Sequence, residues 1–114
     1  MEKVTDFNAY GERALATSLT QTLDKANFTY PVFGICGEAG EIAEKVKKII
    51  RDKNNVLTEN DKLEISKELG DVLWYINRMA WSMDRTLEDI ANLNLEKLES
   101  RQKRGVLSGN GDNR

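Results

Sequence analysis

The sequence predicts an all-α protein: a four-helix, bundle-like subunit of an oligomeric all-α assembly. Apolar residues recur at intervals of three and four over most of the 114 residues, which is the period of helices that bury one face. Two segments begin with the pattern Thr-x-x-Asp, at Thr58 and Thr86, which caps the N-terminus of a helix. At this length, a protein with long helices often completes its core by oligomerising.

The N-terminal part is expected to contain the weakest helix. It lies within residues 1–20 and begins near Thr5 or Asp6. Gly11 lowers its helix propensity, so its packing must come from other parts of the chain. Residues 20–30 show no sustained period and are expected to form a loop. The candidate inward residues of this helix are Phe7, Tyr10, Ala14 and Thr17.

A second helix is expected from Pro31 to about Arg51. Pro31, the only proline, fits the first turn of a helix because its missing N–H does no harm there. The apolar face consists of Val32, Ile35, Cys36, Ala39, Ile42, Ala43, Val46, Ile49 and Ile50. A polar stripe at the edge of this face, in a position that suits a cleft, consists of Glu38, Glu41, Lys45 and Lys48.

The third helix is expected from the Thr58 cap to about Met83 and is apolar on two sides. A helix that is apolar on two sides is buried on two sides, so one side should meet another subunit. Trp74 and Trp81 lie on that second side, and Trp81 is the stronger candidate for the interface. We therefore expect a homodimer or a homotetramer built around this helix. The core side consists of Ile65, Leu69, Val72, Leu73, Ile76, Met79, Ala80 and Met83.

The fourth helix is expected to open at Thr86 and to end before Gly105, which suits the position after a helix C-terminus. Its inward face also carries Asn94, Lys97 and Arg101. Two cations on an inward face are costly unless an anion meets them. The apolar residues of this face are Leu87, Ile90, Ala91, Leu93 and Leu98.

The chain divides into one helical domain, residues 1–104, and a C-terminal tail, residues 105–114. The tail is rich in Gly and Asn and has neither a helical nor a strand pattern. No linker and no internal repeat divide the domain further.

Composition narrows the classes of function. The net charge of −2 argues against nucleic acid as a partner. No apolar run approaches the ~20 residues that span a bilayer, so no membrane partner is expected. The single cysteine, Cys36, permits no disulfide within the chain and fits a cytoplasmic location. The absence of His excludes Ser-His-Asp catalysis, the usual zinc sites and the Glu-x-x-His pattern of di-iron bundles.

Two pairs of carboxylates lie in the second and third helices. Glu38 and Glu41, and likewise Glu68 and Asp71, are three residues apart, so each pair shares one helix face. Like charges at this spacing repel, and the repulsion grows with desolvation. A hard divalent cation, Mg²⁺ or Mn²⁺, would remove it. The alternative is that both pairs are solvated helix faces, since Glu is a good helix former.

These motifs resemble those of the MazG-like, all-α nucleoside triphosphate pyrophosphohydrolases, whose signature is Glu-x-x-Glu followed at a distance by Glu-x-x-Asp. The segments that carry the resemblance are 30–48 and 67–75. Segments 94–101 and 109–114 are similar to the single-domain phage and bacterial branch of the family. In all, the resemblance covers about residues 6–114.

The resemblance implies hydrolysis of nucleoside or deoxynucleoside triphosphates to the monophosphate and pyrophosphate, for nucleotide-pool control or house-cleaning. It implies that Glu38, Glu41, Glu68 and Asp71 bind Mg²⁺, with Mn²⁺ as a possible substitute. Glu41 would also orient or deprotonate the attacking water.

The resemblance also implies a set of substrate-binding residues. Lys97 and Arg101, with Asn94, would hold phosphate oxygens, and Tyr75 would line the pocket or belong to the core. The candidates for the base pocket are Phe7, Asn8, Tyr10, Phe28 and Trp74. Nothing in the sequence selects a base or a sugar.

A second class of function stays open. The chain would then be a non-catalytic helical interaction or regulatory module that binds Mg²⁺ structurally, or one that binds a nucleotide without turnover. Pyrophosphate release that depends on Mg²⁺ separates the two classes. A di-metal redox bundle is disfavoured because the chain contains no His.

Overall fold

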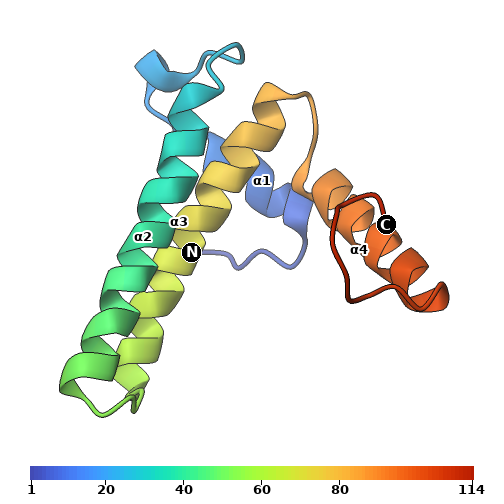
Figure 1. Cartoon of the computed structure of the whole chain (residues 1–114). Helices are drawn as coiled ribbons and strands as arrows, with labels where there is room; N and C mark the ends of the chain where they lie inside the picture. Colours follow the sequence, from blue (N-terminus) through green and yellow to red (C-terminus); the bar gives the residue numbers. More distant parts are fainter.

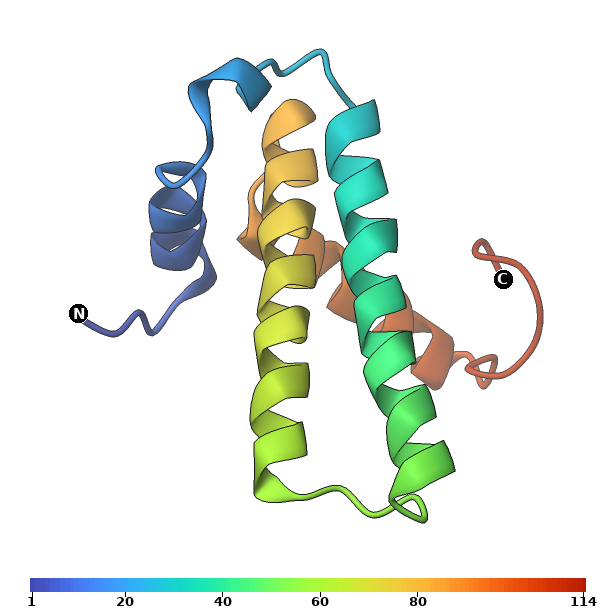
Figure 2. The same ribbon diagram turned by 90° about the vertical axis from the view of Figure 1, so that its left-hand side faces the viewer.

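The body of the molecule is a hairpin of two long antiparallel helices (Figures 1 and 2). The computed structural model describes residues 1–114 and contains four α-helices, one short 3-10 helix and no strand. The hairpin consists of α2 (Thr29–Asp52) and α3 (Glu59–Ser82), each 24 residues long. The predicted all-α fold is confirmed, and both helices end within two residues of their predicted bounds. None of the helices has the length and apolarity that crossing a bilayer requires.

An apolar seam holds the hairpin together. Ile35, Ile42 and Ile49 follow one another at intervals of seven residues, which puts them on the same side of α2. They are the least exposed of its apolar positions after Pro31, and α3 is the main neighbour of α2. The turn that closes the hairpin contains Asn54 and Asn55 at φ values of 52° and 61°, a left-handed conformation that Asn tolerates better than most residues.

The broad apolar face predicted for the second helix is not buried as one surface. The isoleucine seam is the part of this face that packs against α3. The other predicted apolar residues follow one another at intervals of four and three on an exposed side of α2. Val46 is 38% exposed and Ile50 57%. We call this exposed set the α2 outer stripe: Val32, Cys36, Ala39, Ala43, Val46 and Ile50.

The N-terminal helix is shorter than predicted: α1 comprises Phe7–Leu15. Thr17, expected on its inward face, lies beyond its end, and its hydroxyl donates to the carbonyl of Ala14 at 2.7 Å. Such bonds from Thr compete with the helical backbone pattern. The segment that follows contains a 3-10 helix at Thr20–Thr22 and is otherwise irregular, as predicted.

The tryptophan side of α3 faces α1 and the loop after it. Trp74 Nε1 donates to the carbonyl of Ala14 at 3.0 Å and to the hydroxyl of Thr17 at 2.8 Å. Trp81 is half-buried, and the guanidinium of Arg78 lies 4.7 Å from its ring centroid. Within one chain, Trp81 lines a hollow with Gly11, Glu12 and Leu15 of α1, so the N-terminal segment meets part of the side that was expected to face another subunit.

Further polar contacts tie the N-terminal segment to α3. Asn77 Nδ2 donates to the carbonyl of Gly11 at 3.0 Å, and a Cβ at Gly11 would lie 2.7 Å from Asn77 Oδ1. Arg78, only 1% exposed, donates to the carbonyls of Thr22 and Asp24 at 2.7 and 2.9 Å. Periodicity assigned no role to this arginine, which is the largest fully buried side chain.

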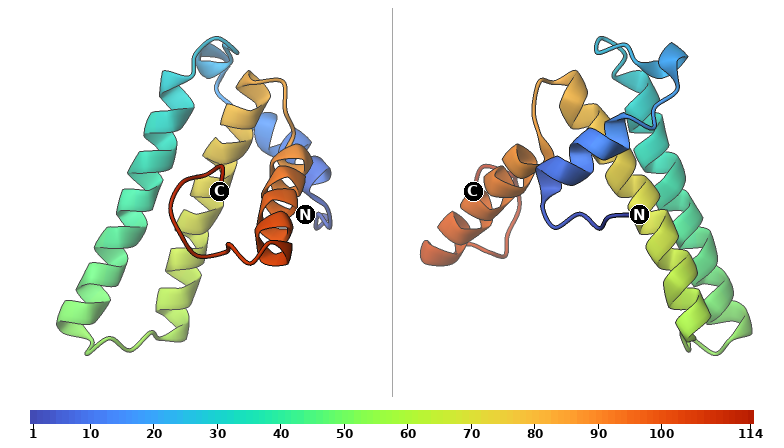
Figure 3. Two further views of the ribbon diagram at one scale, coloured as in Figure 1. Left: turned by 45° about the vertical axis from the view of Figure 1, so that its right-hand side comes forward. Right: turned by 180° about the vertical axis from the view of Figure 1, so that it is seen from behind.

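α4 (Leu87–Lys103) is directed away from the hairpin (Figures 1 and 3). Its start agrees with the predicted cap at Thr86, and Leu87 is buried. Ile90 and Ala91 of its predicted inward face are half-buried, but the prediction is corrected for Leu93, which is 57% exposed, and Leu98, which is 38% exposed. In a single chain, α4 has too few neighbours to cover these leucines, since its main neighbours among the helices are α1 and α3 and it is otherwise directed away from the hairpin.

The predicted capping box at the start of α3 is confirmed and extended by a lysine. Thr58 Oγ1 accepts from the N–H of Asp61 at 3.1 Å, and Asp61 Oδ2 accepts from the N–H of Thr58 at 3.0 Å. Lys53 Nζ donates to Asp61 Oδ1 at 2.7 Å. The Lys53 hydrogen bond, followed by that from the Thr58 backbone, lowers the pKa of Asp61 to about 2.

A capping carboxylate with this low pKa predicts an acid-dependent loss of stability. Its contribution is fully present above the ordinary carboxyl pKa and is lost as the pH falls through about 2. At neutral pH, Asp61→Asn should lower the melting temperature, and the difference from the unmodified protein should vanish as the pH approaches 2. Glu59→Gln is the matched control, because Glu59 is also in the first turn but its side chain is 91% exposed. A difference for Asp61→Asn that persists unchanged at pH 2 would contradict this account.

Candidate active site

Three of the four predicted metal-binding carboxylates meet between the long helices. Glu38 comes from α2, and Glu68 and Asp71 come from α3. One carboxylate oxygen from each residue lies within 4.8 Å of those of the other two. Glu38 and Glu68 are half-buried and Asp71 is exposed. The hairpin therefore brings Glu38 and Glu68, which are 30 positions apart in the sequence, into one acidic cluster at its surface.

Glu41 lies outside this acidic cluster. It is exposed and sits one turn after Glu38 on α2. Its charge is nevertheless close enough to contribute to the raised pKa of Glu38. The i, i+3 spacing correctly makes Glu38 and Glu41 neighbours, yet only the first of them faces α3.

The electrostatics of the cluster favour a bound cation. A hydrogen bond with Glu68 is the largest cause of the raised pKa of Glu38, followed by burial and the charges of Asp71, Glu68 and Glu41. The compensating cation in the chain is Lys45, whose Nζ lies 3.7 Å from Glu68 Oε1. One ammonium cannot balance three carboxylates. The donor set, carboxylate oxygens at the edge of solvent, fits a hard divalent ion such as Mg²⁺.

An aromatic pocket adjoins the acidic cluster. Tyr75 contacts Trp74 and Tyr30 edge-on, at centroid distances of 5.0 and 5.9 Å. A hydrogen bond with Tyr30, then burial, raises the pKa of Tyr75, and the charges of Glu38 and Asp71 add to this effect. The pocket is lined by Thr17, Glu38, Asp71, Trp74 and Tyr75, and its volume of about 400 Å³ is in the usual range for small-molecule sites.

Gly34 places Tyr75 at this position. A Cβ on Gly34 would lie only 2.2–2.5 Å from atoms of the Tyr75 ring. No side chain other than hydrogen fits there, so α2 and the tyrosine ring meet directly. The sequence contains the glycine but no signal for the contact, because the two residues lie on different helices.

The base-pocket candidates separate in space. Tyr10 lies near the cluster, since burial and then the charge of Asp71 raise its pKa. Phe7 shares an apolar hollow with Tyr10 beside α3. Asn8 instead donates to Glu88 Oε2 at 2.8 Å, toward α4. Phe28 is 48% exposed at the start of α2.

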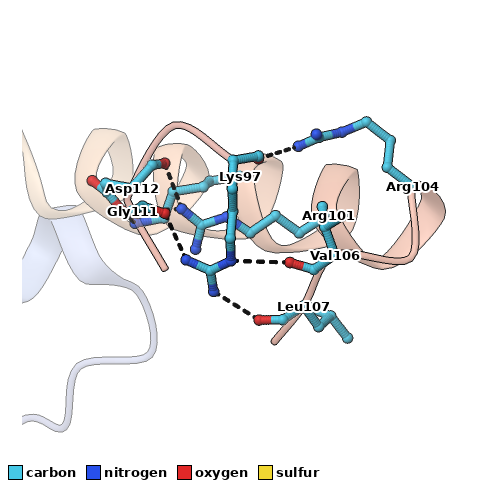
Figure 4. A network of polar contacts seen from close by, with 8 residues as sticks. Lys97, Arg101, Arg104, Val106, Leu107, Gly111 and Asp112 are labelled. Carbon is cyan, nitrogen blue, oxygen red and sulfur yellow. Dashed lines mark hydrogen bonds and ion pairs between the residues drawn. The ribbon is translucent and has the colours of Figure 1, made fainter. Parts of the chain in front are cut away.

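The predicted phosphate-binding residues lie on α4, apart from the acids. Lys97 Nζ and Arg101 Nη2 approach the same oxygen of Asp112, at 2.9 and 3.1 Å (Figure 4). Asn94 is exposed. No ion pair joins α4 to the acidic cluster. The expectation that these cations point at the same interior as the acids is thus not met within one chain, because α4 turns away from the hairpin.

Two residues of this region were missed by sequence reasoning. Lys45 was placed on a polar stripe, but its partner Glu68 is 23 positions away on another helix. Asp112 lies in a tail that shows no periodicity. The one available signal was its Gly-rich surroundings, which are typical of a segment that turns sharply.

Comparison with known proteins assigns these motifs to one family. The model of the MazG nucleotide pyrophosphohydrolase domain matches residues 32–106. This range contains all four predicted metal-binding carboxylates and both predicted phosphate-binding cations, Lys97 and Arg101. The Gene 37 protein of Mycobacterium phage L5 is 50% identical over 86 residues, which are 75% of each of the two chains. No solved structure matches the chain.

The contact between Gly34 and Tyr75 yields a prediction with an internal control. Gly34→Ala should destabilise the protein by about 1–3 kcal/mol, the usual cost of overpacking, because the Tyr75 ring must move. Gly37→Ala is the control: a Cβ there meets nothing within 4 Å, and it should stabilise α2 by up to about 1 kcal/mol. Urea unfolding followed by circular dichroism measures both. Equal effects of the two substitutions would show that the ring is not held by Gly34.

Proposed function

Because the chain belongs to the MazG nucleotide pyrophosphohydrolase family, we propose that it hydrolyses nucleoside or deoxynucleoside triphosphates to the monophosphate and pyrophosphate. The observation that carries this proposal is the cluster of three carboxylates beside an aromatic pocket. We propose Mg²⁺ as the cofactor, with Mn²⁺ as a substitute, and nucleotide-pool control or house-cleaning in the cytoplasm as the role. A bound divalent cation would explain why a protein keeps three mutually repelling acids together, since it would bridge them and the negatively charged triphosphate.

The acids divide into two roles. Glu38, Glu68 and Asp71 would hold the ion, and Glu41 would reach it from the solvent side with one carboxylate oxygen and keep the other for the attacking water. The bound ion would neutralise charge on the triphosphate and lower the pKa of the attacking water. Lys45 beside Glu68 would limit the negative charge that remains.

Glu41 is the proposed general base. It is exposed and near the cluster without being part of it, so its carboxylate stays available to a water molecule. The water oxygen forms a bond to the α-phosphorus as its proton passes to Glu41. The bond from the α-phosphorus to the bridging oxygen breaks, and pyrophosphate leaves with the electron pair.

The nucleoside would occupy the pocket next to the acids. Tyr75 and Trp74 provide its aromatic walls, with Tyr10 close to Asp71. Thr17 provides a hydroxyl, although it already accepts from Trp74 Nε1. Lys97 and Arg101, with Asn94, would bind phosphate oxygens.

The separation of α4 from the acids supports assembly into a homodimer or a homotetramer. A second copy of the chain is the proposed occupant of the α2 outer stripe. Its spacing of four and three is that of a helix–helix seam, and a two-fold axis would pair the stripe with itself. Ala39 and Ala43 at its centre permit close approach of two backbones. Assembly would also supply neighbours for the exposed Leu93 and Leu98 of α4.

The proposed activity is tested with a panel of canonical and modified NTPs and dNTPs in the presence of Mg²⁺. The expected products are the monophosphate and pyrophosphate, with no turnover after removal of the metal by EDTA. Glu68→Gln should reduce turnover by orders of magnitude while sparing or raising metal-free stability, since it removes one of the repelling charges.

Glu64→Gln is the matched control for this variant, because Glu64 lies one turn earlier on α3, pairs with Lys67 and is outside the cluster. It should retain turnover. Release of orthophosphate and the diphosphate would refute attack at the α-phosphorus. Nucleotide binding without any turnover would favour the non-catalytic binding module.

Assembly is tested by sedimentation equilibrium at micromolar concentration. We expect a mass at least twice that of the 12.9 kDa chain. Val46→Glu should shift the equilibrium toward the monomer, because it places a charge in the α2 outer stripe. Val56→Glu is the control, since Val56 is 61% exposed and lies in the turn outside the stripe. A monomer for the unmodified chain would overturn the proposed assembly.

A further inference from the structure

The C-terminal tail is folded into a closed loop against α4 (Figure 4). The guanidinium of Arg114 donates to three tail carbonyls, those of Val106, Leu107 and Gly111, at 3.1, 2.7 and 2.6 Å. Arg104, the residue after the end of α4, in turn donates to the backbone oxygen of Arg114 at 2.8 Å. The tail thus has its own internal scaffold, although it contains no helix or strand.

The scaffold brings one carboxylate onto two cations. Asp112 Oδ1 accepts from Lys97 Nζ and from Arg101 Nη2, and Arg101 Nη2 also donates to the backbone carbonyl of Asp112. Gly109 and Gly111, at φ values of 128° and 87°, allow the turns that lead into Asp112. The hydrogen bonds from Lys97 and then Arg101 hold the pKa of Asp112 below its usual value.

The two charged groups of this ion pair differ in burial, and therefore in how much each loses when the pair is broken. The Arg101 side chain is only 6% exposed, whereas that of Asp112 is 77% exposed. Arg101 Nε is buried without a hydrogen-bond partner. A buried guanidinium requires an anion, because water cannot solvate it. An exposed carboxylate returns to water at little cost.

A phosphate group suits the two cations better than the carboxylate does. Carboxylate and phosphate oxygens accept from the same donors. One carboxylate leaves an excess positive charge on Lys97 and Arg101, which a multiply charged phosphate would neutralise. Asp112 is therefore an exchangeable anion, and a phosphate group is an anion that can replace it.

We propose that the tail is an anionic strap: Asp112 occupies the Lys97–Arg101 pair in the free protein and is displaced by the phosphate oxygens of the ligand. This inference rests on the proposed function, because that function assigns Lys97 and Arg101 to the binding of substrate phosphates. A tethered competitor acts at an effective concentration on the order of millimolar. The strap therefore weakens phosphate binding and restricts the site to anions of high charge.

The test measures binding of inorganic pyrophosphate by calorimetry in EDTA, so that neither metal nor turnover is involved. Asp112→Asn should tighten binding by roughly 3- to 10-fold, because it removes the competing charge. Asp84→Asn is the matched control: its carboxylate is 76% exposed and pairs with Lys25, and its loss should leave binding unchanged. Lys97→Met should weaken binding.

A second variant separates the strap from a purely structural tail. Arg114→Gln loosens the scaffold but keeps the Asp112 charge, and it too should tighten pyrophosphate binding. In the unmodified protein, amide hydrogen exchange in residues 105–114 should accelerate when pyrophosphate binds. Unchanged or weaker binding by Asp112→Asn, or exchange that pyrophosphate does not accelerate, would overturn the proposal. Tighter binding by Asp112→Asn with no NTP hydrolysis would support the strap and refute only the catalytic function.

Discussion

The mutual repulsion of Glu38, Glu68 and Asp71 is the constraint that the rest of the hairpin must offset. Their carboxylate oxygens lie within 4.8 Å of one another, an arrangement that opposes folding in the absence of a cation. The isoleucine seam of α2, the capping box of α3 and the close contact at Gly34 supply the opposing stabilisation. Functional sites commonly depart from the local rules of stability in this way and are compensated elsewhere in the fold.

The long helices were predictable because local signals determine them. The period of the apolar residues and the caps at Thr58 and Thr86 located α2, α3 and α4 within about two residues. α1 was overestimated, since Thr17 ends it by bonding to the carbonyl of Ala14. Periodicity also could not identify which neighbour a face meets. It grouped Trp74 and Trp81 correctly, but the partner proved to be the N-terminal segment of the same chain.

The site was predictable only to the extent that it follows helix geometry. The spacing of the acid pairs correctly indicated which residues share a face, and three of them meet across the hairpin. The separation of Glu41 from the cluster depends on the rotation of α2 about its own axis, which spacing does not specify. The partner of Lys97 and Arg101 depends on a fold of the Gly-rich tail, and this has no repeating pattern to detect.

The polar ties of the N-terminal segment bring a second part of the chain to the candidate site in the hairpin. Arg78, Asn77 and Trp74 attach residues 7–24 to α3 through hydrogen bonds to backbone carbonyls, and none of these bonds involves α2. Within the hairpin, these bonds therefore hold the segment through α3 alone, and they supply two carbonyl acceptors to the buried guanidinium of Arg78. The segment carries Tyr10 and Thr17, whereas the acids belong to the hairpin. Under the proposed function, the ion would be held by the hairpin alone, whereas the nucleoside would contact both parts of the chain, through Trp74 and Tyr75 of α3 and Thr17 of the N-terminal segment.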